Sequence, residues 1–273
     1  MVVDIKGVPV YYEVFGEGRP VLCIHGYWVD HRLMTGCLEP IFEQTQGYRR
    51  IYLDLPGMGK TPAADWLKNA DDMLELVIAF IDAVIPGEQL LVAGESFGGY
   101  LTLGLIAKLG VLIDGVLMIA PKIVTENRQK LPARTIIWQT KIQELEEQAE
   151  ALENFMEMAV IAMPEIYAQY KVDVLSGIRV ADRAFLTEQF YGGFSHDFEA
   201  RLQQVEFNRP TCYVTGRQDH VVGYHDAYQL LDNFPRATFA ILDGAGHNVQ
   251  VDNVPLFQTL VKDWLWRLEL EMV

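Results

Sequence analysis

One hexapeptide constrains the fold more than any other stretch of the chain. Residues 94–99, Gly-Glu-Ser-Phe-Gly-Gly, stand between an apolar run at 90–93 and a helical run at 100–109. This is G-x-S-x-G at a strand-to-helix crossing, where the glycines permit a sharp turn that exposes the serine hydroxyl above the sheet edge. An ordinary glycine-rich β-to-α turn is the alternative interpretation. The flanking strand and helix favour Ser96 as a nucleophile.

Strand and helix patterns alternate along most of the chain. The N-terminus reads as a β-hairpin turning at Lys6-Gly7, and the apolar run at 21–24 is typical of a strand buried on both faces. Strands separated by helices at this spacing pair in parallel through right-handed crossovers. The pattern predicts an α/β fold with a mostly parallel, doubly wound sheet. Strands are expected at 2–5, 9–15, 21–24, 50–54, 90–93, 115–120, 211–214 and 238–242, and helices at about 33–44, 69–85, 100–109 and 256–270.

The strand pattern stops from about Lys122 to Phe207. Apolar residues recur there at helical spacing among many Glu and Gln residues, for example at Leu152, Phe155 and Met156. The sequence therefore predicts a helical insertion between the sixth strand and the last two.

The composition limits the classes of partner. The chain has 273 residues, of which 50% are hydrophobic, enough for one large domain or one domain with an insertion. Its formal net charge is −15, and no basic stripe stands out, which disfavours nucleic acid and anionic membranes as partners. A small, neutral or apolar molecule is the expected partner, and the oligomeric state, monomer or homodimer, is left open.

The compartment follows from cysteine usage and from the N-terminus. Three cysteines, Cys23, Cys37 and Cys212, share no metal-type spacing, and their odd number fits a reducing compartment. Residues 1–6 lack the layout of a signal peptide, and no run of 18 apolar residues is present. We expect a soluble cytoplasmic protein that needs no metal and no cofactor.

A serine nucleophile needs a base, and the base needs a carboxylate. The loop after the last strand offers His247, and the loop after the strand before it offers Asp219. The chain order Ser96, Asp219, His247 is the order expected for a nucleophile elbow on such a sheet. Asp226 and Asp252 are rival acids, but the first lies in an expected helix and the second follows the histidine.

With these motifs the sequence resembles the α/β-hydrolase superfamily over its whole length. The motifs that carry the resemblance, besides the Asp219/His247 pair, are His25-Gly26, the run at 54–59 (Asp-Leu-Pro-Gly-Met-Gly) and the run at 94–99. The resemblance implies an α/β-hydrolase core formed by residues 1–121 and 206–273. It also implies a helical cap inserted after strand 6, at residues 122–205.

The resemblance also implies where an oxyanion would bind. Its two donors are expected to be the backbone N–H groups of Phe97, directly after the nucleophile, and of Tyr27, directly after His-Gly. Aromatic packing is the alternative role for Tyr27 and Trp28. In the superfamily's motif the histidine at position 25 is structural, and His31, His196, His220 and His225 are not expected to take part in catalysis.

Many aromatic residues and methionines of the insertion are candidates for an apolar pocket, although most such residues form the core of a cap. The residues expected to bind substrate are Trp28, Trp138, Tyr191 and Phe194.

These features together predict a serine hydrolase of carboxylesterase type. It would cleave a small, largely apolar ester, thioester, amide or lactone through an acyl-enzyme. Carbon–carbon bond hydrolases and aminopeptidases of the same fold remain alternatives. The first usually carry Asn or His before the serine, where this chain has Glu95. A ligand receptor that retains the triad is the alternative from another functional class.

Overall fold

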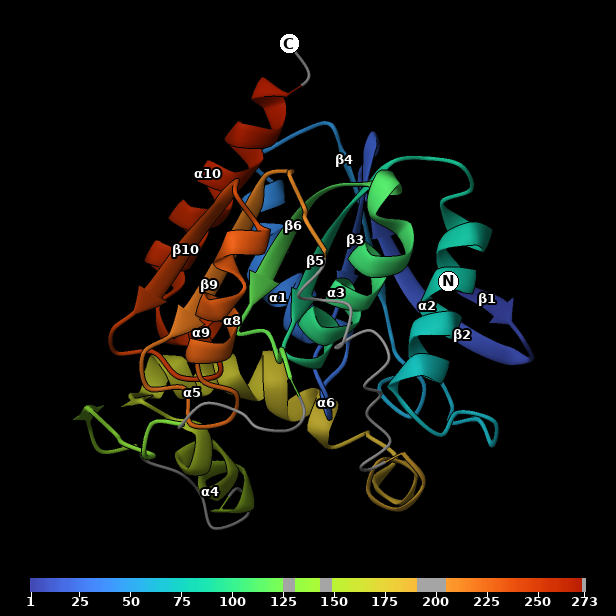
Figure 1. Cartoon of the computed structure of the whole chain (residues 1–273). Coiled ribbons are helices and arrows are strands. Elements are labelled where there is room, and N and C mark those ends of the chain that lie inside the picture. Colours follow the sequence, from blue (N-terminus) through green and yellow to red (C-terminus); the bar gives the residue numbers. More distant parts are fainter. Residues whose placement is uncertain (125–130, 143–148, 191–204, 272–273) are drawn as a thin grey trace.

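An eight-stranded sheet forms the centre of the molecule in a computed structural model that describes residues 1–124, 131–142, 149–190 and 205–271. The strand order is β1-β2-β4-β3-β5-β6-β9-β10 (Figure 1). β1 and β2 pair antiparallel, β2 pairs antiparallel with β4, and the pairs from β4 to β10 are parallel. The predicted α/β fold with its N-terminal hairpin is confirmed. The strands are β1 (Val2–Ile5), β2 (Val8–Phe15), β3 (Arg19–Ile24), β4 (Tyr48–Leu53), β5 (Leu90–Glu95), β6 (Ile113–Ile119), β9 (Thr211–Gly216) and β10 (Ala237–Leu242).

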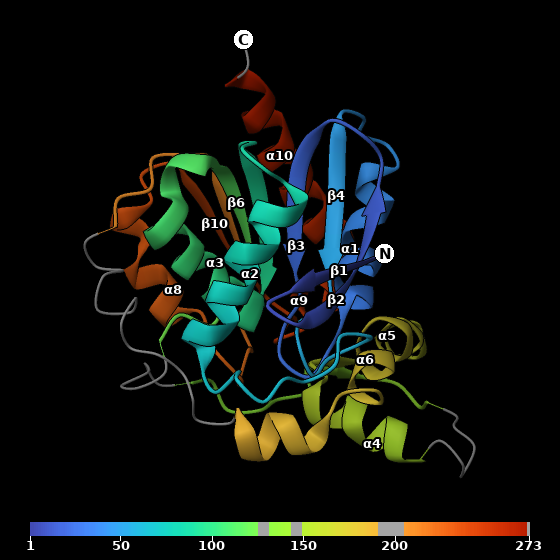
Figure 2. The same cartoon turned by 90° about the vertical axis from the view of Figure 1, so that its right-hand side faces the viewer.

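Helices cover both faces of this sheet (Figure 2). The residues of α2 and α3 belong to the hydrophobic cluster on one face, and those of α1 and α10 to the cluster on the other. α2 shows why such helices form: Asn69 caps it by accepting from the Asp72 N–H, and its apolar stripe faces the sheet. The helices of the core are α1 (His31–Phe42), α2 (Ala70–Val84), α3 (Phe97–Leu109), α8 (His225–Gln229), α9 (Val249–Asp252) and α10 (Val254–Leu270).

The insertion after β6 is confirmed, and it lies at the carboxyl ends of the parallel strands (Figure 1). Its described elements pack against the core on both faces of the sheet, since Phe155 joins one hydrophobic cluster and Phe190 the other. A separate cap domain bounded at 122 and 205 stays a prediction. The elements are β7 (Trp138–Gln139), α4 (Ala149–Met158), β8 (Ile161–Ala162), α5 (Pro164–Tyr170), a π-helical turn η3 (Lys171–Leu175), α6 (Ser176–Ile178) and a second π-helical turn η4 (Phe185–Gln189).

Two features of the insertion differ from a purely helical segment. β7 and β8 form a small parallel pair, and each has two residues, too few for an alternating pattern to show in the sequence. The turns η3 and η4 are π-helical rather than α-helical. Turns of this kind are rare and are frequent at functional sites.

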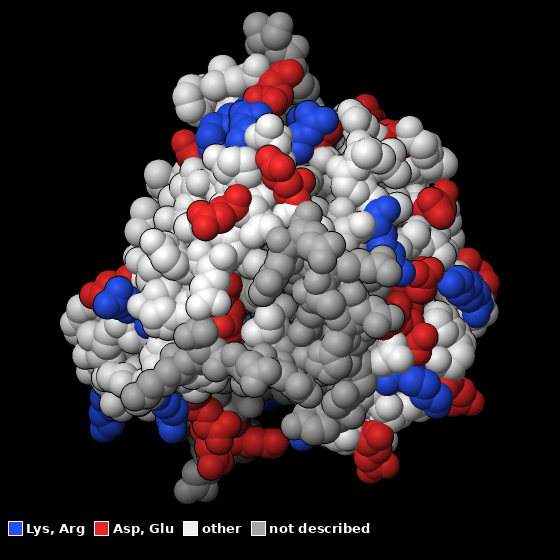
Figure 3. Space-filling view, in the orientation of Figure 1, with Lys and Arg blue, Asp and Glu red and all other residues white. Residues whose placement is uncertain are grey.

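The surface carries mixed charge. On the face shown in Figure 3, Lys and Arg side chains stand among Asp and Glu side chains over the described residues. Within the same described part of the chain, no helix is long and apolar enough to cross a membrane.

Candidate active site

Ser96 lies at the turn from β5 into α3, in a strained backbone conformation. Its φ of 51° falls in the left-handed region, which non-glycine residues rarely adopt. The Ser96 N–H donates to the Ile119 carbonyl at 2.9 Å, and the Ser96 carbonyl accepts from the N–H groups of Tyr100 at 3.1 Å and Lys122 at 3.0 Å. A Cβ at Gly98 would lie 2.1 Å from the Ile24 carbonyl oxygen, so only glycine fits there. The expected sharp turn at the serine is confirmed.

Three side chains from three separate loops meet at this turn. His247 Nε2 lies 2.9 Å from Ser96 Oγ, and His247 Nδ1 lies 3.0 Å from Asp219 Oδ2. The other carboxylate oxygen of Asp219 accepts from the N–H groups of Val221 at 2.9 Å and Val222 at 3.0 Å. With Asp219 accepting from Nδ1–H, Nε2 is the ring atom that can accept the proton of Ser96.

Burial and neighbouring charges shift the pKa values of His247 and Asp219. Burial lowers the pKa of His247, but the charge of Asp219, the hydrogen bond to it and the charge of Glu95 raise that pKa to about 9 overall. Burial raises the pKa of Asp219, and the opposing charge of His247 and the bonds it accepts hold that pKa below its ordinary value. Asp219 and His247 therefore stabilise each other's charged forms: Asp219 is ionised, and His247 is more basic than an ordinary histidine.

Neither rival acid takes the position of Asp219 at His247 Nδ1. Asp226 is in α8, and Asp252 is in α9, where its Oδ2 accepts from the Gly246 N–H at 2.7 Å. Asp252 therefore holds the loop that carries His247, a role that its position in the sequence does not indicate.

The loop after β3 brings Tyr27 beside the nucleophile turn. The rings of Tyr27 and Phe97 lie 5.6 Å apart, and Phe97 is the first residue of α3. The Tyr27 hydroxyl donates to the Leu186 carbonyl at 2.7 Å, which ties the loop to the insertion. Trp28 follows with a φ of 74° and packs edge-on against Tyr27. The rings of Tyr27, Trp28 and Phe97 thus pack against one another where this loop meets the nucleophile turn.

His25 holds this loop against the residue that follows Asp54. His25 Nδ1 lies 2.7 Å from the Gly26 carbonyl, and His25 Nε2 accepts from the Leu55 N–H at 3.0 Å. Burial lowers the pKa of His25, which fits a neutral ring with one donor and one acceptor nitrogen.

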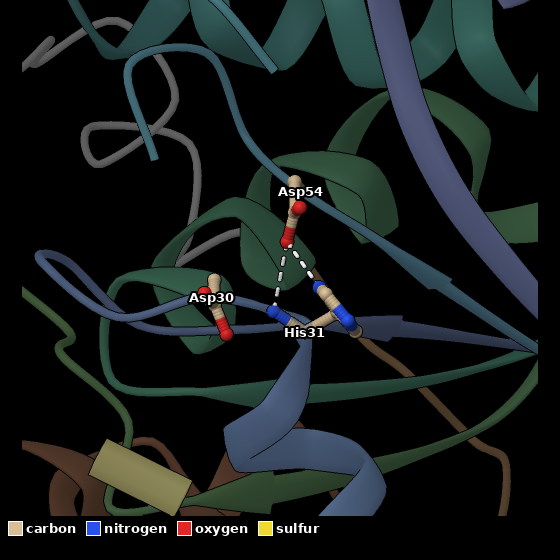
Figure 4. A group of neighbouring side chains, drawn as sticks. All are labelled: Asp30, His31 and Asp54. Carbon is tan, nitrogen blue, oxygen red and sulfur yellow. Dashed lines mark hydrogen bonds and ion pairs between the residues drawn. The ribbon is translucent and has the colours of Figure 1, made fainter. Parts of the chain in front are cut away.

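Asp54 belongs to a buried cluster with Asp30 and His31 at the start of α1 (Figure 4). Asp54 Oδ1 accepts from the His31 N–H at 2.9 Å and from His31 Nδ1 at 2.7 Å, while Asp54 Oδ2 accepts from the Lys60 N–H at 2.8 Å. Asp30 caps α1 by accepting from the Arg32 N–H. The atoms that would ligate a metal ion already hold hydrogen bonds to protein groups, so we interpret the cluster as a structural brace.

The residues expected to bind substrate have different surroundings. Trp28 lies beside Tyr27, as described, whereas Trp138 is 49% exposed in β7, with its ring against Gly244 in the loop before His247. Tyr191 and Phe194 lie outside the described residues, as does His196. Phe190, in contrast, is buried against Tyr27 and Phe97, with ring centroids 6.0 and 5.9 Å away. The binding roles of Trp28, Trp138, Tyr191 and Phe194 stay predictions.

Glu95 is a further residue of this site, and the sequence motifs do not indicate its contact with His247. It is the last residue of β5, it is 2% exposed, and its Oε1 lies 3.7 Å from His247 Nε2. A signal was present, because a glutamate at the end of an otherwise apolar strand is seldom buried without a partner.

Known proteins are similar to this chain in sequence and in structure. The 2-hydroxy-6-oxo-6-(2'-aminophenyl)hexa-2,4-dienoic acid hydrolase of Metapseudomonas resinovorans is 28% identical over 268 residues, 97% of this chain and 90% of that protein. A pimeloyl-[acyl-carrier protein] methyl ester esterase of Shewanella oneidensis is 26% identical over 268 residues, covering 94% and 95%. The crystal structure of an alpha/beta superfamily hydrolase from Oenococcus oeni PSU-1 superposes with a TM-score of 0.89 at 27% identity, covering 95% and 96%.

The match to a family extends over most of the chain. Residues 21–258 match the alpha/beta hydrolase family, a range that includes Ser96, Asp219 and His247. With this match, the fold and the triad arrangement, the chain belongs to the alpha/beta hydrolase family and is a serine hydrolase.

Proposed function

We propose that the protein hydrolyses a small, largely apolar carboxylic ester through an acyl-enzyme on Ser96. The observation that carries the proposal is the continuous chain of contacts from Ser96 Oγ to His247 Nε2 and from His247 Nδ1 to Asp219. Thioesters, amides and lactones are related substrates for the same acyl chemistry. The esterase relatives support an ester as the substrate class.

The chemistry follows the triad. Ser96 Oγ attacks the substrate carbonyl carbon while its proton passes to His247 Nε2, and the electron pair of the carbonyl bond moves to oxygen. The N–H groups of Tyr27 and Phe97 are the proposed donors to that oxyanion. When the tetrahedral intermediate collapses, His247 gives the proton to the leaving alcohol. Water then repeats the sequence on the acyl-enzyme and releases the acid.

The surroundings of the triad favour a neutral substrate. Rings of Tyr27, Phe97 and Phe190 offer apolar contact, and two further carboxyl groups, Glu95 and Asp252, lie near His247. Glu95 and Asp252 each have a pKa of about 7, because burial raises it, and in their ionised forms they would repel a substrate with its own carboxylate. The site therefore supports a neutral ester better than a dienoic acid.

Carbon–carbon bond hydrolysis is the second candidate, favoured by the relative from Metapseudomonas resinovorans. The experiment that separates the candidates is a panel of substrates: p-nitrophenyl esters of two to eight acyl carbons, a lactone, an aminoacyl p-nitroanilide and a 2-hydroxy-6-oxo-dienoic acid. We expect turnover of the short esters with a burst of p-nitrophenol. Turnover of the dienoic acid without the esters would favour the second candidate. A fluorophosphonate-reactive enzyme with no turnover of any substrate would favour a receptor.

A further inference from the structure

Glu95 is a buried carboxyl group that the triad mechanism does not use. It closes β5, directly before the nucleophile, and its side chain is 3% exposed. Burial raises its pKa, the charge of His247 opposes that increase and the charge of Asp219 adds to it, and the result is a pKa of about 7. Such a group changes its charge within the pH range in which a serine hydrolase works.

The position of Glu95 relative to His247 is specific. Its Oε1 lies 3.7 Å from Nε2, the same nitrogen that faces Ser96, while Asp219 lies on the Nδ1 side. The imidazole is thus held between two carboxyl groups, one at each nitrogen. An opposite charge at this distance favours the protonated ring.

The oxyanion loop fixes the carboxyl group in place. A Cβ built on Gly26 would lie 2.1 Å from Glu95 Oε2, so glycine at position 26 is what leaves room for the carboxyl group. A hydrogen bond with the Gly26 backbone favours the ionised form. Glu95 therefore touches both the base and the loop that carries Tyr27.

Other titratable groups also face this pair in the described part of the chain. Asp219 and His220 lie on the loop after β9, Asp252 on α9 and Cys37 on α1. Burial raises the pKa of the Cys37 thiol, which keeps it neutral, and burial raises the pKa of Asp252 to about 7. Asp252 acts on His247 less than Asp219 and Glu95 do. Glu95 is thus the carboxyl group on the Nε2 side of the ring.

We propose that Glu95 is a positioning residue that shares one proton with His247 and so sets the pH at which Ser96 becomes nucleophilic. When the pair loses this proton as pH rises, His247 Nε2 can accept the serine proton, as it also can in the form that carries the proton on Glu95. With the proton on His247, Nε2 is already protonated, Ser96 has no base, and the ionised Glu95 stabilises this inactive form. The inference rests on the proposed function of Ser96 and His247, and it adds a control of their protonation.

The test measures the rate of Ser96 phosphonylation by a fluorophosphonate from pH 5 to pH 10. Three proteins are compared: wild type, Glu95→Gln, and Glu88→Gln as a control that removes a charge from an exposed glutamate paired with Arg49. We expect the wild-type rate to rise through a midpoint well above that of an ordinary histidine, about 6.5. Glu95→Gln should shift the midpoint down by about 1 to 3 pH units, and Glu88→Gln should leave it unchanged. A Glu95→Gln protein that is slower at every pH with the same midpoint would overturn the proposal.

A second measurement uses the wild-type protein and therefore remains decisive if Glu95→Gln does not fold. It also separates the proposed role of Glu95 from the proposed function of Ser96. The imidazole of His247 in the wild type is titrated by NMR, with the resonance assigned through a His247→Gln variant. Titration in two coupled steps is expected, because two groups share the proton. A single step near the ordinary histidine pKa would overturn the role of Glu95. If wild type is not phosphonylated at any pH, the proposed function fails, and the NMR titration still decides the proton sharing.

Discussion

At the residue scale, the ring of His247 depends on Asp219 for both its orientation and its tautomer. Asp219 is fully buried, and one of its oxygens accepts from two backbone N–H groups while the other faces Nδ1. A carboxylate held in this way directs Nε2 to the serine and stabilises the imidazolium that forms during attack. An amide at the same position lacks the charge that stabilises the imidazolium, and its nitrogen can donate to Nδ1 and so select the wrong tautomer.

Replacing Asp219 with Asn should lower kcat by roughly ten-thousand-fold, because the amide permits the wrong histidine tautomer. The measurement is ester turnover, with folding checked by circular dichroism. Asp226→Asn is the matched control, since Asp226 lies in α8, and it should keep nearly normal kcat. A near-normal Asp219→Asn enzyme with an impaired Asp226→Asn enzyme would give the acid role to Asp226.

Residue types and chain order were enough to predict the triad, because each member follows a strand at the same sheet edge. Glu95 and Asp252 were not predictable as neighbours of His247. Their contacts depend on side-chain directions at the ends of β5 and in α9, and on the absence of a Cβ at Gly26. The contacts made by Phe190 were not predictable either, because they depend on how η4, which directly precedes Phe190, is placed over the core.

At the scale of elements, the π-helical turn η3 carries a buried carboxyl group onto α1. Asp173 accepts from Gln169 Nε2 at 2.6 Å, and a Cβ at Gly36 would lie 2.3 Å from its Oδ1. Burial raises the pKa of Asp173 to about 6 despite the bond from Gln169. Helical periodicity alone does not distinguish such a turn from the α-helix around it, which explains why the sequence indicated only a helical segment.

This contact predicts a pH dependence of stability. Between the ordinary aspartate pKa and about 6, the folded state binds more protons than the unfolded state, so the free energy of unfolding falls as pH rises. Asp173→Asn should remove about 2 to 3 kcal/mol of this fall between pH 4 and pH 7, measured by urea unfolding. Glu165→Gln, an exposed change in α5, is the control. Parallel pH profiles for wild type and Asp173→Asn would contradict the account.

At the scale of the whole molecule, the core supplies the reacting groups, and we expect the insertion to supply part of the apolar surface beside them. Phe190 follows η4 and packs on Tyr27 and Phe97, whereas Trp138 lies half exposed against the loop that carries His247. The mostly parallel sheet, its N-terminal hairpin and the point of insertion follow from strand patterns along the chain, whereas the order of the strands in the sheet was not predicted. The residues that line the pocket cannot be predicted in this way, because a periodic apolar stripe has the same pattern whether it packs in the core of a cap or faces a substrate.

Phe190→Ala should change the ranking of esters by acyl chain length, because a methylene in an apolar pocket changes specificity by about ten-fold or more. Phe207→Ala is the matched control: it removes a phenylalanine of similar burial that packs on Phe234. The measurement is kcat/KM over the ester panel. An unchanged ranking in Phe190→Ala, alongside a loss of stability like that of Phe207→Ala, would show that Phe190 is only packing.

The central claim, an acyl-enzyme on Ser96, is tested most directly by locating the acyl group. The protein is mixed with p-nitrophenyl butyrate, quenched in acid during the burst, digested and mapped by mass spectrometry. We expect a butyryl group on the peptide containing Ser96, no such group in Ser96→Ala, and a loss in turnover of that variant on the order of a million-fold. A butyryl group on another residue, or a Ser96→Ala protein that keeps more than about a tenth of wild-type turnover, would contradict the claim.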